Sequence, residues 1–275
     1  MFLWGGGWTA LKILTESVPV EILSFWRFLI MFIAFIPMLI YIKKPLRLPK
    51  KSAPYIMGSA VLNVLFMIFA YLGVERSTAG SGGVIITVLS PIFTFLLSLL
   101  ILKTAYYKQQ YFGLFIGLIG GAIMLNIQDL NSFFNGGEFY FILCAMTWAG
   151  VTLLAQHSHI HIHAIHYSFF IAGFATLILF FVTLFQDINM VFRQDMNFWI
   201  ALLYLGVLGQ TVATTIYFVA SRKLGSSKAS SFMFLVPVFA LLVSYMVLDE
   251  LIKLHVVVGG LVSLFSVYLI NKKWA

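Results

Sequence analysis

The feature that most constrains this chain is a series of long apolar stretches separated by short polar breaks. A helix needs about 20 mostly apolar residues to cross the roughly 30 Å hydrocarbon core of a bilayer. Reading between the breaks gives ten stretches, at about residues 1–15, 20–42, 53–74, 79–102, 110–127, 137–155, 164–185, 197–220, 228–248 and 252–270. The sequence therefore predicts an all-α polytopic membrane protein with ten transmembrane helices.

Composition argues against the other fold classes. Hydrophobic residues make up 61% of the chain and charged residues only 9%, whereas an ordinary soluble chain is about 25% charged. An outer-membrane barrel is disfavoured, because its strands alternate apolar and polar residues. The single cysteine, Cys144, excludes a disulfide framework and a metal site built from cysteines.

The charges are distributed unevenly along the chain. If the N-terminus is cytoplasmic, twelve of the 17 Lys and Arg residues fall on the cytoplasmic side, namely Lys43, Lys44, Arg47, Lys50, Lys51, Lys103, Lys108, Arg222, Lys223, Lys228, Lys272 and Lys273. Four fall on the opposite side, together with the acidic residues. By the positive-inside rule this split predicts a cytoplasmic (inner) membrane protein with both termini in the cytoplasm. The net charge of +8 is therefore interpreted as an orientation signal, and no nucleic-acid partner is expected.

The chain resembles itself at a shift of 146 residues. The matches include Tyr71/Tyr217, Arg76/Arg222, Ser81/Ser227, Pro91/Pro237, Ser98/Ser244 and Gly113/Gly259. We expect two five-helix repeats, at residues 1–127 and 137–273. Because five is odd, the second repeat enters the membrane upside down. Inverted repeats are typical of secondary transporters, whose substrate site lies near the membrane centre between the repeats.

Several motifs carry a resemblance to a known family. They are Leu3-Trp4-Gly5-Gly6-Gly7, Arg27-Phe28, Ser90-Pro91, Leu224-Gly225-Ser226-Ser227, Val236-Pro237 and Leu248-Asp249-Glu250. In this order they resemble the drug/metabolite transporter superfamily, of the EamA type with two five-helix repeats. The resemblance implies an exporter or exchanger of metabolites, including amino acids, driven by an ion gradient or by exchange. The sequence departs from that pattern at Lys103-Thr104, where the family usually has an acidic Gly-Glu pair.

One ionisable residue, Arg27, lies clearly inside a predicted helix. Such residues are costly in a bilayer and mark functional sites by default. The alternatives are that Arg27 reaches the outer headgroups or pairs with Glu16 or Glu21. No acidic residue lies well inside a predicted helix, so a bare cation is disfavoured as substrate and a zwitterion, an anion or a neutral metabolite is favoured.

Other polar and aromatic residues at depth complete a candidate binding site. The substrate-binding candidates are Trp4, Trp8, Arg27, Asn63, Tyr71, Ser90, Trp148, Gln210, Thr214 and Tyr217. Together they would form a largely apolar pocket with few polar points, which is the usual composition of a small-molecule site. Taken singly, each of the aromatic residues is as compatible with packing or with interfacial anchoring.

A second set of residues is predicted to open and close the path. Gly6, Pro91 and Pro237 are candidate hinges, because glycine and proline weaken helices, although glycine also serves close helix packing. Arg76 and Arg222 are equivalent in the repeat and would lie at opposite mouths, which makes them candidate gates. For Arg222 the alternative is an orientation charge.

Histidines cluster between the sixth and seventh predicted helices, at positions His157, His159, His161, His163 and His166. Imidazoles bind divalent metals and titrate near neutral pH, but a spacing of two does not define a tetrahedral site. The alternative function is a transporter of metal ions or cationic drugs that uses the histidines of this loop. Adventitious metal binding or a solvated loop explains the histidines without it.

These observations predict a secondary transporter that exports a small metabolite, such as an amino acid or another zwitterion or anion, by alternating access. Its partners would be the substrate, the lipid bilayer, and protons or a counter-substrate. The chain would act as a monomer or a homodimer. No catalytic constellation is present, so neither an enzyme nor a cofactor is expected, and no metal site is predicted.

Overall fold

The computed structural model describes residues 1–15, 17–43, 45–76, 79–125, 137–158, 162–248 and 254–272, and every regular element in these ranges is helical. The first helices are α1 (Phe2–Thr15), α2 (Val20–Ile42), α3 (Ala53–Arg76), α4 (Ala79–Leu100) and α5 (Lys108–Leu125). They are followed by α7 (Glu138–Ser158), α8 (Ala164–Val182), η1 (Ile188–Arg193), α9 (Met196–Leu203), η2 (Tyr204–Ala213) and α10 (Thr214–Leu224). The last are α11 (Ser226–Ser231), η3 (Phe232–Leu235), α12 (Val236–Leu248) and α13 (Leu254–Asn271).

Six helical stretches in the described ranges are long and apolar enough to cross a membrane. They are Val20–Ile42, Ala53–Arg76, Gly82–Leu100, Glu138–Ser158, Ala164–Val182 and Met196–Leu224. Large apolar side chains such as Ile33, Phe115 and Leu264 are exposed on the surface, as lipid-facing residues are. The chain is therefore an all-helical, multi-pass membrane protein. The number of ten crossings remains a prediction, because the other helices are shorter or less apolar.

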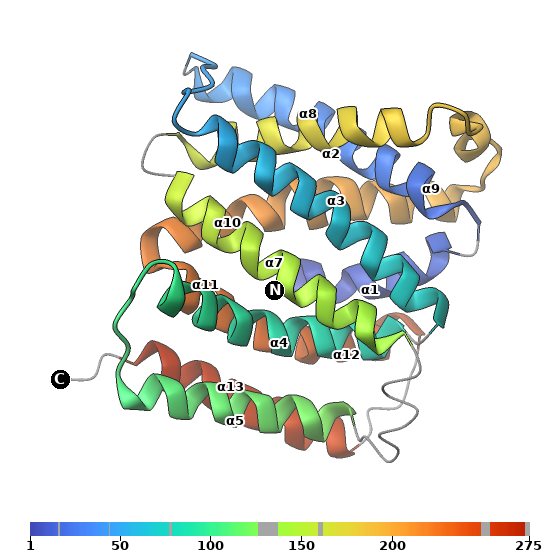
Figure 1. Ribbon diagram of the computed structural model, residues 1–275. Coiled ribbons are helices and arrows are strands. Elements are labelled where there is room, and N and C mark those ends of the chain that lie inside the picture. The colour runs from blue at the N-terminus through green and yellow to red at the C-terminus, as the bar shows by residue number, and fades with distance from the viewer. Residues whose placement is uncertain are drawn as a thin grey trace.

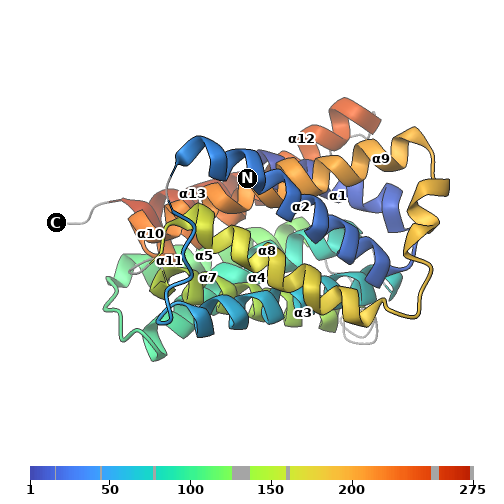
Figure 2. The same ribbon diagram turned by 90° about the horizontal axis from the view of Figure 1, so that it is seen from above.

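The long helices run side by side along one common direction, and the chain turns at two opposite ends (Figure 1). We call one the basic end, because the turns there carry Lys43, Lys50, Lys103, Lys228 and Lys272. The other is the acidic end, where the described carboxylates Glu21, Glu75, Glu138, Asp187 and Asp195 lie. Figure 2 shows the same common direction from above, with α3 and α12 on opposite sides of the bundle.

Local sequence explains where several helices begin and end. Pro19 immediately precedes α2, and the helix ends at Lys43, which has a left-handed backbone (φ 53°). Gly225 separates α10 from α11 with φ 87°, a conformation that favours glycine. The Asp195 carboxylate caps α9 by accepting a hydrogen bond from the backbone N–H of Phe198 at 2.9 Å.

Small residues allow close contact between α5 and α13, which lie together at one side of the bundle (Figure 1). A Cβ added at Gly120 would lie 2.9 Å from the carbonyl oxygen of Gly259. The Ser266 hydroxyl donates to the Gly113 carbonyl at 2.6 Å across the same interface. Small residues bring membrane helices together in this way because packing contacts replace the hydrophobic driving force.

The remaining helices pack in pairs around the centre of the bundle. The main pairs are α3 with α7, α4 with α7, α2 with α8, and α1 with α12. The largest buried cluster includes Phe28, Met67, Trp148 and Phe218, from four different helices. This packing leaves a cavity in the interior.

Candidate functional site

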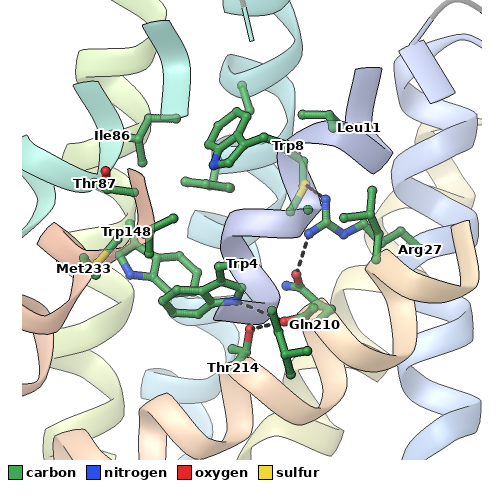
Figure 3. Close-up of a pocket in the computed structure, with 18 of the residues that line it drawn as sticks. Trp4, Trp8, Leu11, Arg27, Ile86, Thr87, Trp148, Gln210, Thr214 and Met233 are labelled. Atoms are coloured by element: carbon green, nitrogen blue, oxygen red, sulfur yellow. Dashed lines mark hydrogen bonds between the residues drawn. The ribbon is translucent and has the colours of Figure 1, made fainter. Parts of the chain in front are cut away.

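A cavity of about 100 Å³ lies in the interior of the bundle, between residues of both predicted repeats. Its apolar wall is formed by Leu3, Trp4, Trp8, Leu11, Phe66, Met67, Ala70, Ile86, Trp148, Leu205, Met233 and Val236 (Figure 3). Its polar side chains are Arg27, Tyr71, Thr87, Gln210 and Thr214. A mostly apolar wall with a few polar groups is typical of a small-molecule site.

Arg27 supplies the positive charge of this cavity. Its Nη2 donates to the Gln210 side-chain oxygen at 3.0 Å, and its Nη1 donates to the Met67 sulfur at 3.6 Å. The Nε group is buried and has no hydrogen-bond partner among the described residues. The Tyr71 hydroxyl lies beside the guanidinium. The guanidinium therefore keeps unused donor capacity, because thioether sulfur is only a weak acceptor.

No described carboxylate balances this charge. None of the residues that line the cavity is acidic, and the carboxylates of the described chain lie at the acidic end. The guanidinium points inward toward Gln210, so it does not reach for the headgroups (Figure 3). Pairing with Glu16 falls outside the described residues. An unbalanced cation in an apolar cavity favours an anionic ligand.

A glycine explains how Gln210 reaches Arg27. Gly206 lies one turn before Gln210 and faces α2, where an added Cβ would meet the Ile30 side chain at 2.7 Å. The missing side chain lets η2 approach α2 closely, and this approach brings Gln210 next to the guanidinium.

The helix that carries Gln210 is locally wide. Residues Tyr204–Ala213 form a π-helix between α9 and α10. The Thr211 hydroxyl donates to the Gly206 carbonyl at 2.8 Å, and the indole of Trp4 donates to the Gly209 carbonyl at 3.0 Å. π-helical segments are rare and occur frequently at functional sites. Sequence reasoning missed this segment, although Gly206 and Gly209 within an apolar helix were a signal of close backbone approach.

Three aromatic rings meet on one wall of the cavity. Trp4 lies edge-to-face with Trp148 at 5.3 Å between centroids, and both contact Tyr217, at 5.2 and 5.6 Å. The Tyr217 hydroxyl hydrogen-bonds with Thr152 at 3.0 Å. Such clusters are rigid and apolar, so they can define the shape of a ligand's body.

The cavity brings together seven of the sequence-predicted substrate-binding residues. They are Trp4, Trp8, Arg27, Tyr71, Trp148, Gln210 and Thr214. Tyr217 lies behind Trp4 and Trp148, and Asn63 donates to the carbonyl of Ser59 in its own helix at 2.8 Å. Ser90 is buried outside the lining, one turn from the lining residues Ile86 and Thr87. Met67 and Met233 line the cavity without having been predicted to bind.

The candidate hinges lie in different surroundings. α1 and α4 run without interruption through Gly6 and Pro91. A Cβ added at Gly6 would collide with the Tyr204 hydroxyl, so Gly6 serves close packing here. Pro237 is the second residue of α12, which directly follows the 3₁₀ segment η3, as expected where proline removes a helix hydrogen bond.

The candidate gates lie at opposite ends of the bundle. Arg76 ends α3 at the acidic end, and its guanidinium lies 4.8 Å from the centre of the Tyr140 ring at the start of α7. Arg222 is exposed near the end of α10, at the basic end. That these two residues act as gates during transport remains a prediction.

The histidine cluster is only partly described, since His159 and His161 lie outside the described residues. The His157 ring packs on Tyr55 at 4.8 Å, and His163 caps α8 by accepting from the Ile165 N–H at 3.4 Å. Within the described ranges no group of three or more His, Cys, Asp or Glu residues could hold a metal ion.

A hydroxyl cluster at the basic end joins segments from both predicted repeats. The hydroxyl of Ser98, near the end of α4, lies 2.8 Å from that of Ser227 in α11, and Tyr106 hydrogen-bonds with both. The backbone N–H of Ser226 donates to the Gln156 side chain at 2.7 Å beside them. These contacts hold α4, α7 and α11 together at this end.

Comparison with known proteins is consistent with this architecture. The EamA-like transporter family matches residues 1–126 and 135–272. An uncharacterised transporter of Bacillus subtilis, YoaV, is 25% identical over 97% of this chain and 92% of its own length. An uncharacterised transporter of Synechocystis is 27% identical over 99% of this chain and 87% of its own length. A WAT1-related chloroplastic protein of Arabidopsis thaliana is 29% identical over 75% of this chain and 51% of its own length.

A solved crystal structure has a similar fold. It superposes with a TM-score of 0.77 and 14% sequence identity, over 98% of this chain and 93% of the other. At this identity the likeness shows the fold alone.

Proposed function

The chain belongs to the EamA-like transporter family, and we propose that it carries a small metabolite with a carboxylate or another anionic group, anchored by Arg27. The family and the relatives are membrane transporters of the drug/metabolite type and not enzymes. The observation that carries the proposal is the guanidinium of Arg27 in a central cavity that no acidic residue lines. The same charge argues against a metal ion or a cationic drug as substrate.

The transporter works by alternating access between two inverted repeats, residues 1–127 and 137–273. The pairing of helices supports this division. Exchanging the halves turns the α1–α12 pair into the α7–α4 pair, and it leaves the α2–α8 and α5–α13 pairs unchanged. The protein would lie in the inner membrane with its basic end in the cytoplasm. The substrate would leave the cell in exchange for protons or for a counter-substrate.

The repeat also assigns the two closures. Ser98 and Ser227 meet at the basic end, and their sequence equivalents are Ser244 and Ser81, on α12 and α4. In the opposite state Ser81 and Ser244 would close the acidic end. Arg76 would belong to the outer gate, at the acidic end, and Arg222 to the inner gate, at the basic end.

Cysteine cross-linking tests this exchange. In a Cys144→Ala background with Thr214→Cys as a reporter thiol in the cavity, the pair Ser98→Cys with Ser227→Cys and the pair Ser81→Cys with Ser244→Cys should each cross-link and block transport. A membrane-impermeant thiol reagent should then reach the reporter from opposite sides in the two cross-linked forms. If both cross-linked forms leave the same side open, alternating access between these pairs is wrong.

Transport itself is tested with purified protein in proteoliposomes. The panel contains amino acids, nucleobases and organic anions, each with and without a proton gradient or a preloaded counter-solute. Arg27→Gln should abolish uptake of the carried solute, whereas Arg193→Gln should not, because Arg193 is exposed and pairs with Asp187 at 3.1 Å outside the cavity. If no solute of the panel accumulates, the proposed function is wrong.

A further inference from the structure

The cavity restricts its ligand more narrowly than the presence of one arginine would. We propose that the substrate is an organic monoanion with an apolar body and no ammonium group, so that the site selects against zwitterionic amino acids. This inference rests on the proposed function, since it treats the cavity around Arg27 as the substrate site.

The cavity offers few groups that could accept a hydrogen bond from an ammonium. An α-ammonium carries three N–H donors and is normally met by a carboxylate or by several oxygens. No residue that lines the cavity has a carboxylate. The Gln210 side-chain oxygen already accepts from Arg27 at 3.0 Å.

Two other polar groups that line the cavity already take part in hydrogen bonds within the protein. The Gly209 carbonyl accepts from the Trp4 indole at 3.0 Å and from the Thr214 hydroxyl at 3.3 Å. The Thr87 hydroxyl donates to the Gly83 carbonyl at 2.6 Å, within its own helix. A buried ammonium would therefore find only neutral oxygens with a spare lone pair and no carboxylate, and a buried charge without a counter-charge is strongly disfavoured.

The positive charge of Arg27 also disfavours an ammonium group on the ligand. The ammonium of an α-amino acid lies close to its own carboxylate, so binding of the carboxylate to Arg27 would bring two positive groups together in an apolar cavity. Like charges at short range repel strongly where water is excluded. The donors that the cavity does offer, Arg27 Nε and the Tyr71 hydroxyl beside it, suit an anion.

The wall of the cavity suits an apolar ligand body. Trp4, Trp8, Trp148 and Phe66 present aromatic surface, and Met67 and Met233 add flexible thioether side chains. Aromatic rings hold apolar and aromatic groups at defined angles, whereas methionine adapts to different shapes. A monocarboxylate with an aromatic or branched aliphatic body fits this wall.

Three probes that share a phenylethyl group test the inference. They are 3-phenylpropanoate, phenylalanine and phenethylamine, which carry an anion, a zwitterion and a cation. Binding is measured by isothermal titration calorimetry on the full chain in lipid nanodiscs, because the neutral forms of 3-phenylpropanoate and phenethylamine are apolar enough to cross bilayers unaided and would obscure transport of these two probes. We expect 3-phenylpropanoate to bind at least about tenfold more tightly than phenylalanine, and phenethylamine to show no binding.

Two variants distinguish recognition of charge from a structural effect. Gln210→Glu places a carboxylate beside Arg27, so it should lower the affinity for 3-phenylpropanoate by at least about tenfold. The preference for 3-phenylpropanoate over phenylalanine should become smaller or reverse. Arg193→Gln, the matched control outside the cavity, should leave all three affinities unchanged. A variant that has merely lost its structure would lose binding of all three probes alike, and size-exclusion chromatography would reveal the loss of structure.

The outcomes separate this inference from the proposed function. Equal or tighter binding of phenylalanine overturns the inference and leaves Arg27 as an anion anchor intact. Absence of binding by all three probes also overturns it, and the proteoliposome panel then decides whether the chain transports any anionic solute. If Gln210→Glu leaves the ratio of the affinities for 3-phenylpropanoate and phenylalanine unchanged, the charge of the cavity does not select the ligand.

Discussion

The central cavity and the α5–α13 pair both join helices from the two predicted repeats, yet opposite kinds of residues build them. At α5–α13, glycines and serines allow backbone contact, as at Gly120 and Gly259. In the cavity, Trp4, Trp148 and Arg27 keep the helices apart and leave space between them. Close packing stabilises one interface, whereas bulky rings and an unbalanced charge prepare the other for a ligand.

This difference means that the two regions should respond differently to substitution. Changes at α5–α13 should alter stability and leave ligand preference unchanged. Changes in the cavity should alter binding and leave the fold intact.

The largest effect is expected for Gly120→Leu. Its Cβ would lie 2.5 Å from the Ser263 hydroxyl and 2.9 Å from the Gly259 carbonyl, so α5 and α13 would have to separate. Overpacking of this kind costs about 3 kcal/mol, which should appear as a clearly lower unfolding temperature in detergent. If the variant unfolds like the parent, the close contact does not support the bundle.

Arg27→Gln should produce the next largest effect, confined to binding. Loss of the guanidinium removes the charge-assisted contact with an anion, and affinity should fall about 100-fold. The unfolding temperature should not fall, because no described carboxylate is left unpaired. An equal loss of stability and affinity would instead make Arg27 a structural residue.

Trp4→Phe should have a moderate effect in the cavity. The ring is retained, but the hydrogen bond to the Gly209 carbonyl is lost, and the π-helical segment loses one contact. Affinity for the anionic ligand should fall about fivefold, in line with the loss of about 1 kcal/mol. Titration calorimetry on Trp4→Phe and on Trp199→Phe, at a position outside the cavity lining, tests this.

Ser266→Ala should have the smallest effect. It removes the hydroxyl that donates to the Gly113 carbonyl at 2.6 Å, which should cost about 0.5 kcal/mol of stability. The relative affinities for the anion and the zwitterion should not change. A changed preference would contradict the separation between the two regions.

The sequence predicted much of the candidate site, because burial of polar groups in a bilayer is costly enough to make them conspicuous. Arg27, Gln210 and Thr214 stand out within apolar stretches, and the cavity contains all three. Asn63 and Ser90 stand out equally, but their positions on α3 and α4 place them outside the lining. The position of a polar residue within an apolar stretch predicts its depth in the membrane. It does not predict toward which side of the helix the side chain points.

The sequence by itself determined that this chain is helical and embedded in a membrane, since apolar stretches of this length can satisfy their backbone groups only as helices in lipid. Only the tertiary structure decided which polar residues meet. Gly206 lets η2 approach α2, the π-helical turn places Gln210 beside Arg27, and the Trp4 indole reaches the Gly209 carbonyl from more than 200 positions away in the chain. Contacts between distant segments depend on how helices pack and rotate against one another, and local sequence does not specify that geometry.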